Sequence, residues 1–262
     1  MSAGKPLFFV STLLLAAAAV LPLVLGAPAL GLGLAALAGY LVVLLGGVMS
    51  PQLAMFAPVL LHTDRTRPEI ALTFDDGPDP VSTRQVLATL ARFDAQATFF
   101  VLGEKARAAP DVLREIANAG HTIGIHADWH DRLFSLRHPS RIVADVERAQ
   151  DTVATITGKR PSLFRPPLGH ISSRTAVAAR RLGLNFVGWE VRSRDGLAGT
   201  SAETVLRRVL AGLRPGAIVL LHDAAERGQR VPAGVMALPG ILEEAARRGL
   251  RCVSLSTTGV HA

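Results

Sequence analysis

From Glu69 onward, short apolar stretches alternate with amphipathic stretches of helical period, and this alternation constrains the fold more than any other feature of the chain. Repeated strand and helix units of this kind build a parallel sheet covered by helices. The predicted strands span 70–74, 97–101, 121–126, 162–165, 185–189, 217–221 and 251–255. The predicted helices span 81–93, 108–119, 139–157, 172–182, 201–212 and 235–248. Such units favour an α/β barrel, and an open doubly wound sheet is the alternative, because periodicity does not say whether the first and last strands meet.

The first fifty residues differ in character from the rest. Residues 7–25 and 29–49 are almost uncharged, and each stretch is long enough to cross the ~30 Å hydrocarbon layer of a membrane as a helix. Pro22, Gly26 and Pro28 interrupt the apolar sequence, so a two-helix hairpin is the first choice and a single bent span with a shallow second segment is the alternative. A cleaved signal peptide fits less well, because the apolar sequence is much longer than the apolar core of a signal peptide.

The chain is basic, with a formal net charge of +7 and a pI of about 10.8. Such a charge suits nucleic acid, anionic lipid or an acidic polymer as a partner. The arginine pairs at 180–181, 207–208 and 247–248 lie near predicted helix C-termini, where cations interact favourably with the helix dipole, so we interpret them as solvated surface. We find no nucleic-acid motif. Cys252 is the only cysteine, which excludes an intramolecular disulfide and a thiolate metal cluster.

Two adjacent carboxylates, Asp75 and Asp76, follow the first predicted strand and precede a Gly-Pro turn. They would repel each other if both stayed ionised without compensation. We therefore expect a division of roles in which one carboxylate binds a cation and the other stays free as a base. A simple polar turn is the alternative, because Asp-Gly sequences often form turns.

Two histidines follow the third predicted strand. The four-residue spacing of His126 and His130 places both imidazoles on one side of a helical turn, where they can hold a single ion. Together with Asp76 they form a set of two His and one Asp that leaves coordination positions open, as in a catalytic zinc site. The same set is the facial triad of iron oxygenases, which remains an alternative.

The fourth predicted strand is followed by the stiff turn Arg165-Pro166-Pro167-Leu168. The two prolines fix their φ angles and carry no amide hydrogen, which leaves the Leu168 amide as a defined donor that suits an oxyanion hole. Arg165 can pair with Asp75 and hold it ionised, although an arginine in such a place can also be a surface turn residue.

Asp195 follows the fifth predicted strand and His222 the sixth, and the two form a candidate general acid with its orienting carboxylate. All these residues follow strands, and the carboxyl ends of parallel strands form the rim on which α/β barrels build their sites. The motifs therefore support one another. No comparable partners are predicted for the histidines at 62, 121, 138 and 170.

Residues 68–255 resemble the polysaccharide deacetylases with a NodB-homology domain, which form carbohydrate esterase family 4. The resemblance rests on motifs that occur in the family's order: Thr73-Phe-Asp-Asp-Gly77, His126-x-x-x-His130, Arg165-Pro-Pro167 and Leu220-Leu-His-Asp223. It implies a distorted (β/α)7 barrel and a divalent metal, usually zinc, that together remove N-acetyl groups from amino-sugar polymers. The roles that it implies are base for Asp75, metal ligand for Asp76, His126 and His130, tether of the base for Arg165, and general acid for His222, oriented by Asp195.

The chain departs from the family pattern at four positions. Ala127 stands where the family usually has Ser or Thr, and Leu168 stands where it has an aromatic residue. Arg192 and Gly196 replace the first Asp and the Trp of the family's Asp-x-x-Asp-Trp motif. The catalytic set is complete, whereas the aromatic surface on which a sugar ring would stack is reduced. We therefore expect a substrate other than an ordinary chitin chain.

These observations predict a transmembrane segment over 1–50, a juxtamembrane linker over 51–67 and a NodB-like catalytic domain over 68–262. The predicted function is metal-dependent removal of N-acetyl groups from a polysaccharide or glycolipid of the cell envelope. Membrane lipid would contact residues 7–49. An inactive glycan-binding domain of the same fold and an iron oxygenase are the alternatives. We expect the catalytic domain on the outer, periplasmic face of a bacterial membrane because the substrate is there, since the few flanking charges hardly distinguish the two orientations.

Overall fold

The computed structural model describes residues 4–25, 30–228 and 230–256. The strands are β1 (Val59–Leu60), β2 (Glu69–Asp75), β3 (Ala97–Leu102), β4 (Thr122–Ala127), β5 (Leu163–Phe164), β6 (Asn185–Val187), β7 (Val191–Arg192), β8 (Ile218–His222) and β9 (Arg251–Cys252). The helices are α1 (Gly4–Leu25), α2 (Leu30–Met49), α3 (Ser82–Arg92), α4 (Gly103–Ala108), α5 (Pro110–Asn118), α6 (Pro139–Thr157), α7 (Ser173–Arg181), α8 (Ala202–Gly212) and α9 (Ala233–Arg247), with short 3-10 turns at Pro51–Leu53, Phe134–Leu136 and Pro167–Gly169.

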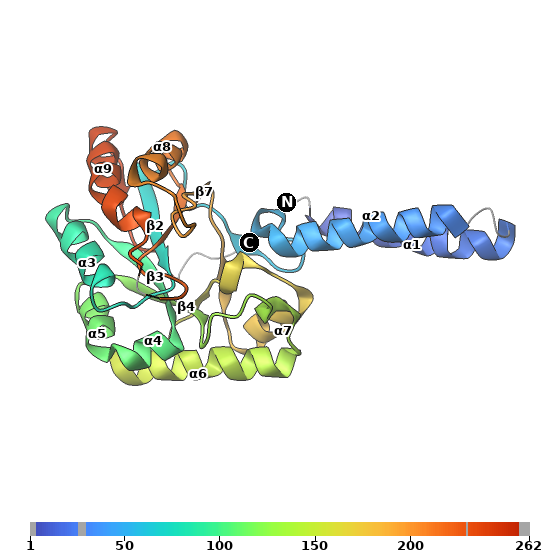
Figure 1. Ribbon diagram of the computed structural model, residues 1–262, viewed down its shortest axis with the longest axis horizontal. Helices are drawn as coiled ribbons and strands as arrows, with labels where there is room; N and C mark the ends of the chain where they lie inside the picture. Colours follow the sequence, from blue (N-terminus) through green and yellow to red (C-terminus); the bar gives the residue numbers. More distant parts are fainter. Residues whose placement is uncertain (1–3, 26–29, 229, 257–262) are drawn as a thin grey trace.

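The strands form a curled parallel sheet in the order β1-β6-β5-β4-β3-β2-β8-β7, with β9 beside β2. β6 pairs with β5, and β7, which follows directly in the chain, pairs with β8 at the other end of this order. The stretch 185–192 therefore spans from one end of the sheet toward the other. Helices cover the outer face (Figure 1). The predicted distorted barrel is confirmed, and the open doubly wound sheet is not formed.

β2 lies in the middle of the sheet, and all seven of its residues are buried. Such continuous burial is typical of a parallel strand that is covered on both faces. Successive side chains point to opposite faces, so Leu72 and Phe74 pack under the helices whereas Ala71 points into the barrel with Phe100 and Trp189. The central strand thus holds Asp75 firmly at the rim.

Some predicted elements differ from the structure, and the strands predicted over 185–189 and 251–255 are shorter. The helix predicted over 108–119 corresponds to α5, and the short helix α4 before it is not predicted. The two helices are separate because Pro110 has no amide hydrogen and disfavours a helical conformation at the preceding residue. The strands β1 and β7 were not predicted, since two residues are too few to show a period.

α1 and α2 pack side by side as a hairpin that extends away from the barrel (Figure 1). Within the described residues, one stretch, Gly31–Met49 of α2, is long and apolar enough to cross a membrane, with a mean hydropathy of 2.2. The apolar part of α1, Gly4–Val20, is a shorter helix. Both helices were predicted from the sequence, and their insertion in a membrane stays a prediction.

The base of the hairpin contacts the barrel directly. The Ile171 amide donates to the Val48 carbonyl at 3.0 Å, and the Gln52 side chain donates to the Trp189 carbonyl at 3.2 Å. Residues 51–67, predicted as a linker, contribute β1 to the sheet and bury Met55. This stretch therefore fixes the hairpin against the walls that follow β5 and β6.

Candidate active site

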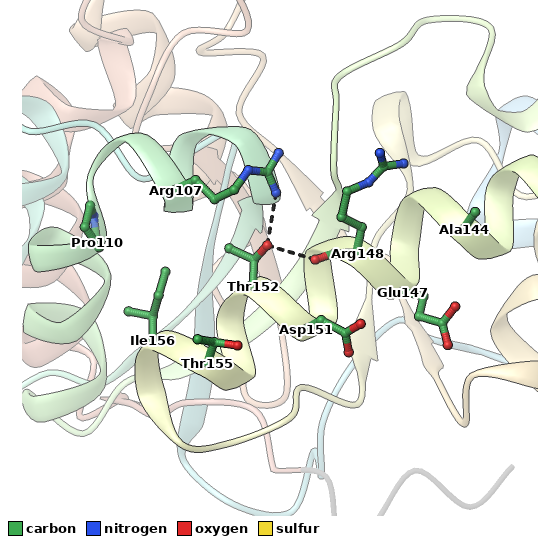
Figure 2. Close-up of a pocket in the computed structure, with 9 residues that line it drawn as sticks. All are labelled: Arg107, Pro110, Ala144, Glu147, Arg148, Asp151, Thr152, Thr155 and Ile156. Carbon is green, nitrogen blue, oxygen red and sulfur yellow. Dashed lines mark hydrogen bonds between the residues drawn. The ribbon is translucent and has the colours of Figure 1, made fainter.

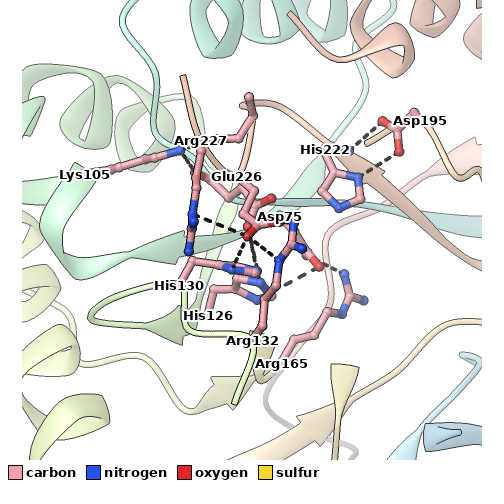
Figure 3. A network of polar contacts seen from close by, with 12 residues as sticks. Asp75, Lys105, His126, His130, Arg132, Arg165, Asp195, His222, Glu226 and Arg227 are labelled. Carbon is pink, nitrogen blue, oxygen red and sulfur yellow. Dashed lines mark hydrogen bonds and ion pairs between the residues drawn. The ribbon is translucent and has the colours of Figure 1, made fainter. Parts of the chain in front are cut away.

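The carboxyl ends of the strands converge on one cluster of buried polar side chains (Figure 3). Asp75 ends β2, His126 lies near the end of β4, Arg165 follows β5, Asp195 follows β7, and His222 ends β8. The structure brings the remaining predicted residues to the same rim: Asp76, His130, Pro166, Pro167 and Leu168. Whether these residues bind metal or act in catalysis stays a proposal, which is made below.

One part of the cluster has the geometry of a metal site. The Oδ1 atom of Asp76 lies 3.4 Å from Nε2 of His126 and 3.6 Å from Nε2 of His130. Two ligand atoms that are each ~2.0–2.1 Å from a tetrahedral ion are separated by about 3.3 Å, so these spacings fit. One ligand atom from each of the three residues lies within 4.8 Å of the others.

The described residues do not provide a bonding partner for the Asp76 carboxylate in this metal-site geometry. Oδ1 of Asp76 is buried and has no hydrogen-bond partner among the described residues. Burial lowers the pKa of His126 well below its ordinary value and also lowers the pKa of His130, so both imidazoles are neutral at pH 7. Burial raises the pKa of Asp76 to about 7. A divalent cation would satisfy a carboxylate and two neutral imidazoles at once, so the residues fit the metal that the sequence predicts.

Local backbone irregularities occur at two of these residues. The pairing of β3 with β4 shifts in register between Ile125 and Ala127, so His126 is the residue that the shift leaves out of the pairing. Such a bulge re-aims a side chain. Asp76 adopts a left-handed φ of 74°, which an L-residue takes at a cost and which ends the extended backbone of β2 at this position.

Asp75 is held by a fully buried arginine. Nη1 of Arg165 donates to Oδ1 of Asp75 at 2.7 Å and to the Thr73 hydroxyl at 2.9 Å. Arg165 also donates to the carbonyls of Val187, the last residue of β6, and Gly188, which follows it. The side chain is 0% exposed, so it is an internal tether and not a surface turn residue. Burial raises the pKa of Asp75, and Arg165 opposes that effect.

His222 and Asp195 form a second bonded pair. Nδ1 of His222 lies 2.8 Å from Oδ1 of Asp195, and the His222 amide donates to Oδ2 at 2.8 Å. The Ser193 hydroxyl donates to Oδ1 at 2.6 Å. Burial opposes a charge on His222, but Asp195, Asp76 and Asp75 outweigh it and raise the pKa of His222 to about 9. The imidazole is therefore protonated at pH 7 and able to donate a proton.

The Pro-Pro turn lines the cavity. Pro167–Gly169 forms a 3-10 turn in which Leu168 takes a left-handed φ of 59°. The Leu168 side chain is 39% exposed at the mouth of the site. A strained, non-glycine residue beside a catalytic cluster is consistent with a backbone that is fixed for binding.

Three supporting residues had no role in the sequence analysis. Nζ of Lys105 donates to the carbonyls of Asp76 and Ala225 and so ties the loops after β2 and β8 together. Asp223 accepts a hydrogen bond from the Thr83 hydroxyl at 2.5 Å, and burial raises the pKa of Asp223 to about 6. The Leu-His-Asp motif contained Asp223, whereas no sequence pattern indicates Lys105, which arrives from α4 only through packing.

Glu226 is the third supporting residue. Its Oε1 lies 3.4 Å from Nδ1 of His130 and 3.0 Å from Nε of Arg132 (Figure 3). The contact is on the ring nitrogen that faces away from Asp76, so Glu226 favours the tautomer of His130 that leaves Nε2 free as a ligand.

The cavity over the cluster holds about 150 Å³. A larger cavity of about 600 Å³ lies on the outside of the barrel, where α6 meets the helices that precede it in the chain (Figure 2). There Arg107 and Arg148 both pair with Asp128, and Arg107 donates to the Thr152 hydroxyl. The buried ligand set and the bonded acid and base lie in the smaller cavity, so chemistry belongs there.

Comparisons with known proteins agree with this geometry. A family model described as polysaccharide deacetylase matches residues 62–187. The chain is 34% identical over 187 residues to a peptidoglycan-N-acetylglucosamine deacetylase of Bacillus cereus, a match that covers 71% of this chain and 66% of the relative. It is 36% identical over 158 residues to a chitooligosaccharide deacetylase of Sinorhizobium fredii, covering 60% of this chain and 72% of the relative. The chain thus spans about two thirds of the length of these curated relatives.

Solved structures show the same barrel. The peptidoglycan N-acetylglucosamine deacetylase Bc1960 superposes with a TM-score of 0.68 at 31% identity, covering 74% of this chain and 89% of that one. A family 4 acetyl xylan esterase of Clostridium thermocellum, solved with a cobalt ion, gives a TM-score of 0.64 at 31% identity and covers 71% and 87%. The chain therefore belongs to the polysaccharide deacetylase family, carbohydrate esterase family 4, and is a hydrolase that acts on the carbon–nitrogen bond of N-acetyl groups.

Proposed function

We propose that the protein is a divalent-metal-dependent deacetylase that removes N-acetyl groups from an amino-sugar glycan of the bacterial cell envelope. The observation that carries the proposal is the convergence of a metal-ligand set, Asp76, His126 and His130, with a separate bonded base and a separate bonded acid. Relatives whose names specify peptidoglycan and chitooligosaccharides support the substrate class.

Asp76, His126 and His130 would hold the ion. Two imidazoles and one carboxylate suit zinc, and the relative solved in complex with a cobalt ion supports a divalent metal. A divalent ion in this place supplies Lewis acidity toward the acetyl carbonyl oxygen and lowers the pKa of water.

The residues of the chain move the protons. Asp75 accepts a proton from the attacking water, because Arg165 engages its Oδ1 and leaves Oδ2, 4.0 Å from Nδ1 of His126, without a bond from the guanidinium. The Leu168 amide donates a hydrogen bond to the oxygen on which negative charge develops. His222, protonated and oriented by Asp195, gives its proton to the departing sugar nitrogen. A carbon–oxygen bond forms, the carbon–nitrogen bond breaks, and acetate and an amine result.

Both alternatives leave observed contacts unexplained. An inactive glycan-binding domain has no use for the charged acid that Asp195 maintains on His222. An iron oxygenase uses a facial triad but needs neither the Arg165–Asp75 pair nor the His222–Asp195 pair. The deacetylase uses all three arrangements.

We further propose that α1 and α2 anchor the catalytic domain on the outer face of the membrane. Gly4 lies against Leu53 and Met55, so the start of α1 is on the same side as the barrel. Lys5 is then on the side of the domain as well, and the positive-inside rule by itself would favour the cytoplasm. The choice of the outer face depends on where envelope glycans are exposed. Protease added to spheroplasts should cleave the region after residue 62, and protection until lysis would contradict this orientation.

The purified full-length protein tests the function directly. It should release acetate from at least one N-acetylated glycan among peptidoglycan fragments, chitooligosaccharides and lipid-linked amino sugars. A chelator should abolish the release and added zinc or cobalt should restore it, with O-acetylated xylan as the comparison for ester cleavage. Acetate release that is unaffected by complete metal removal would contradict the proposal.

A further inference from the structure

The cavity over the catalytic cluster is small. Its volume of about 150 Å³ is below the ~300–1,000 Å³ of pockets that enclose a drug-sized ligand. It has room for the reacting acetylamino group and its immediate surroundings. The neighbouring groups of the substrate must therefore lie at the mouth, and the residues there decide which substrates bind well.

One side of the mouth is strongly cationic. Arg192 and Arg194 line the cavity, both are exposed, and neither forms an ion pair with any described residue. Two further arginines, Arg208 and Arg230, donate to backbone carbonyls of the loop between β7 and α8, at Ser193 and Gly196. The only carboxylate of this loop, Asp195, is buried and bonded to His222, so it does not offset the charge.

Arg192 is held in place on this side. Its guanidinium carbon lies 5.7 Å from the centre of the Trp189 ring, which is within the range of a cation–π contact. His170, in the loop after β5, lies close enough that Arg192 adds to the effect of burial in lowering the pKa of its imidazole. The position of Arg192 corresponds to the first Asp of the family motif, so this chain has a cation where the family pattern has an anion.

The side of the mouth that contains Trp189 also contacts the end of the α1–α2 hairpin. Gln52, just after α2, donates to the Trp189 carbonyl, and Val48 of α2 accepts from the Ile171 amide. Figure 1 shows the turn after β5 next to the end of α2. The cationic side of the mouth therefore adjoins the end of the hairpin, which places it near the lipid surface if the hairpin is inserted.

We propose that Arg192 and Arg194 bind a phosphate group of the substrate, and that the preferred substrate is an N-acetylated amino sugar joined through phosphate to a membrane lipid. The guanidinium fork binds phosphate through two parallel hydrogen bonds. The small cavity places this phosphate next to the reacting sugar, and the hairpin contacts favour a lipid as its carrier. This inference rests on the proposed deacetylase function and names its substrate class.

The test compares acetate release by the full-length protein from three substrates. These are a neutral chitooligosaccharide, soluble N-acetylglucosamine 1-phosphate, and an N-acetylglucosaminyl phosphate lipid in vesicles of neutral lipid. The variants are Arg192→Ser/Arg194→Ser and the conservative Arg192→Lys/Arg194→Lys. Arg181→Ser is the matched control, because it removes an exposed arginine of α7 that forms no described ion pair and does not line the cavity.

The readout is the ratio of kcat/KM for a phosphate substrate to kcat/KM for the neutral one. Hydrogen bonds to charged groups contribute enough that the serine variant should lower this ratio about 10- to 100-fold, and raised salt should lower it in the wild type. The lysine variant should retain most of the ratio, and the Arg181 control should not change it. A ratio that the serine variant leaves unchanged would overturn phosphate recognition.

The two phosphate substrates separate the sources of the phosphate. Faster reaction of the lipid-linked sugar than of the soluble one supports presentation from the membrane, and the opposite order overturns that part of the proposal. If the wild type releases acetate from the neutral glycan alone, the inference fails while the deacetylase function stands. If it releases acetate from peptidoglycan fragments but from none of the three substrates, the inference also fails while the deacetylase function stands. If it releases acetate from none of these glycans, the proposed function is what has failed.

Discussion

The two halves of the active site differ in how far the protein itself satisfies their polar atoms. In the acid–base half, Arg165 bonds Asp75, and His222 and Ser193 bond Asp195. In the ligand half, Oδ1 of Asp76 is buried without a hydrogen-bond partner among the described residues, and it faces Nε2 of His126 and of His130.

This difference shows how one rim can serve two purposes. Buried polar atoms are nearly always hydrogen-bonded, so the unpaired carboxylate oxygen of Asp76 requires another partner, and a cation between it and the two imidazoles supplies it. The acid–base half is already fixed by protein contacts and does not need the ion for its geometry. Predictions about each half can therefore be tested separately.

The largest effect is expected from the His222–Asp195 pair. His222→Ala removes the proposed acid and should lower kcat by ~10² to 10⁴-fold, with metal content unchanged. Asp195→Ala should cost a similar factor, because the imidazole loses its charge and its orientation. The double variant should be little worse than either single one, as for residues that act as a unit. A double loss equal to the product of the two single losses would show that they act independently.

Removing the buried arginine that holds Asp75 should mainly lower the free energy of unfolding. Arg165→Met leaves the Asp75 carboxylate buried without its partner, which typically destabilises a protein by about 3–5 kcal/mol. Urea unfolding of the variant measures it. Arg160→Met is the control, because its pair with Asp151 is exposed and worth at most about 1 kcal/mol. Equal effects of the two changes would contradict a structural role of the internal pair.

The pH dependence should report the acid half. His222 has a raised pKa of about 9, so it is protonated below that value and the rate should fall as the pH rises through it. Asp75 and Asp76 contribute to the raised pKa, and a bound cation would offset them, so the alkaline limb is expected at or somewhat below pH 9. Asp195→Asn removes the charge that contributes most to raising the pKa of His222. The pKa of His222 should then fall, and the alkaline limb should move toward lower pH. If the alkaline limb does not move in this variant, a group other than His222 is responsible for it.

The smallest effect is expected from Glu226. Glu226→Gln weakens the contact that orients His130 and should reduce metal affinity by roughly 10-fold, the low end for such partners, because the contact is 3.4 Å long and shared with Arg132. Competition with a metal indicator measures the affinity. Glu190→Gln, a carboxylate bonded to Arg65 away from the cavity, is the control and should leave the affinity unchanged. An unaltered affinity in the Glu226 variant would remove it from the site.

Much of the rim could be predicted because its residues follow strands with clear apolar patterns. The apolar run of β2 fixes Asp75 at a strand end, and the run of β8 does the same for His222. The sequence predicts that Asp195 follows the strand at 185–189, whereas it follows β7, which the sequence does not predict. Its position was still right because β7 joins the same sheet next to β8.

Other features depend on packing that no local pattern encodes. The internal position of Arg165 results from the curling of the sheet, which brings β2 and the end of β6 around one side chain. Lys105 reaches the site from α4 across the top of β2. The contact of Gln52 with Trp189 depends on where the hairpin meets the barrel. Such contacts join residues that are distant in sequence, so periodicity and turn chemistry do not reveal them.

The central claim is that two adjacent carboxylates have different roles, and the metal content of two matched variants tests it most directly. Asp75→Asn and Asp76→Asn make the same change at neighbouring positions. We predict that Asp75→Asn keeps one divalent ion per chain and loses ~10² to 10⁴-fold in kcat, whereas Asp76→Asn loses the ion itself. Stoichiometric metal in the Asp76 variant, or its loss from the Asp75 variant, would contradict the account.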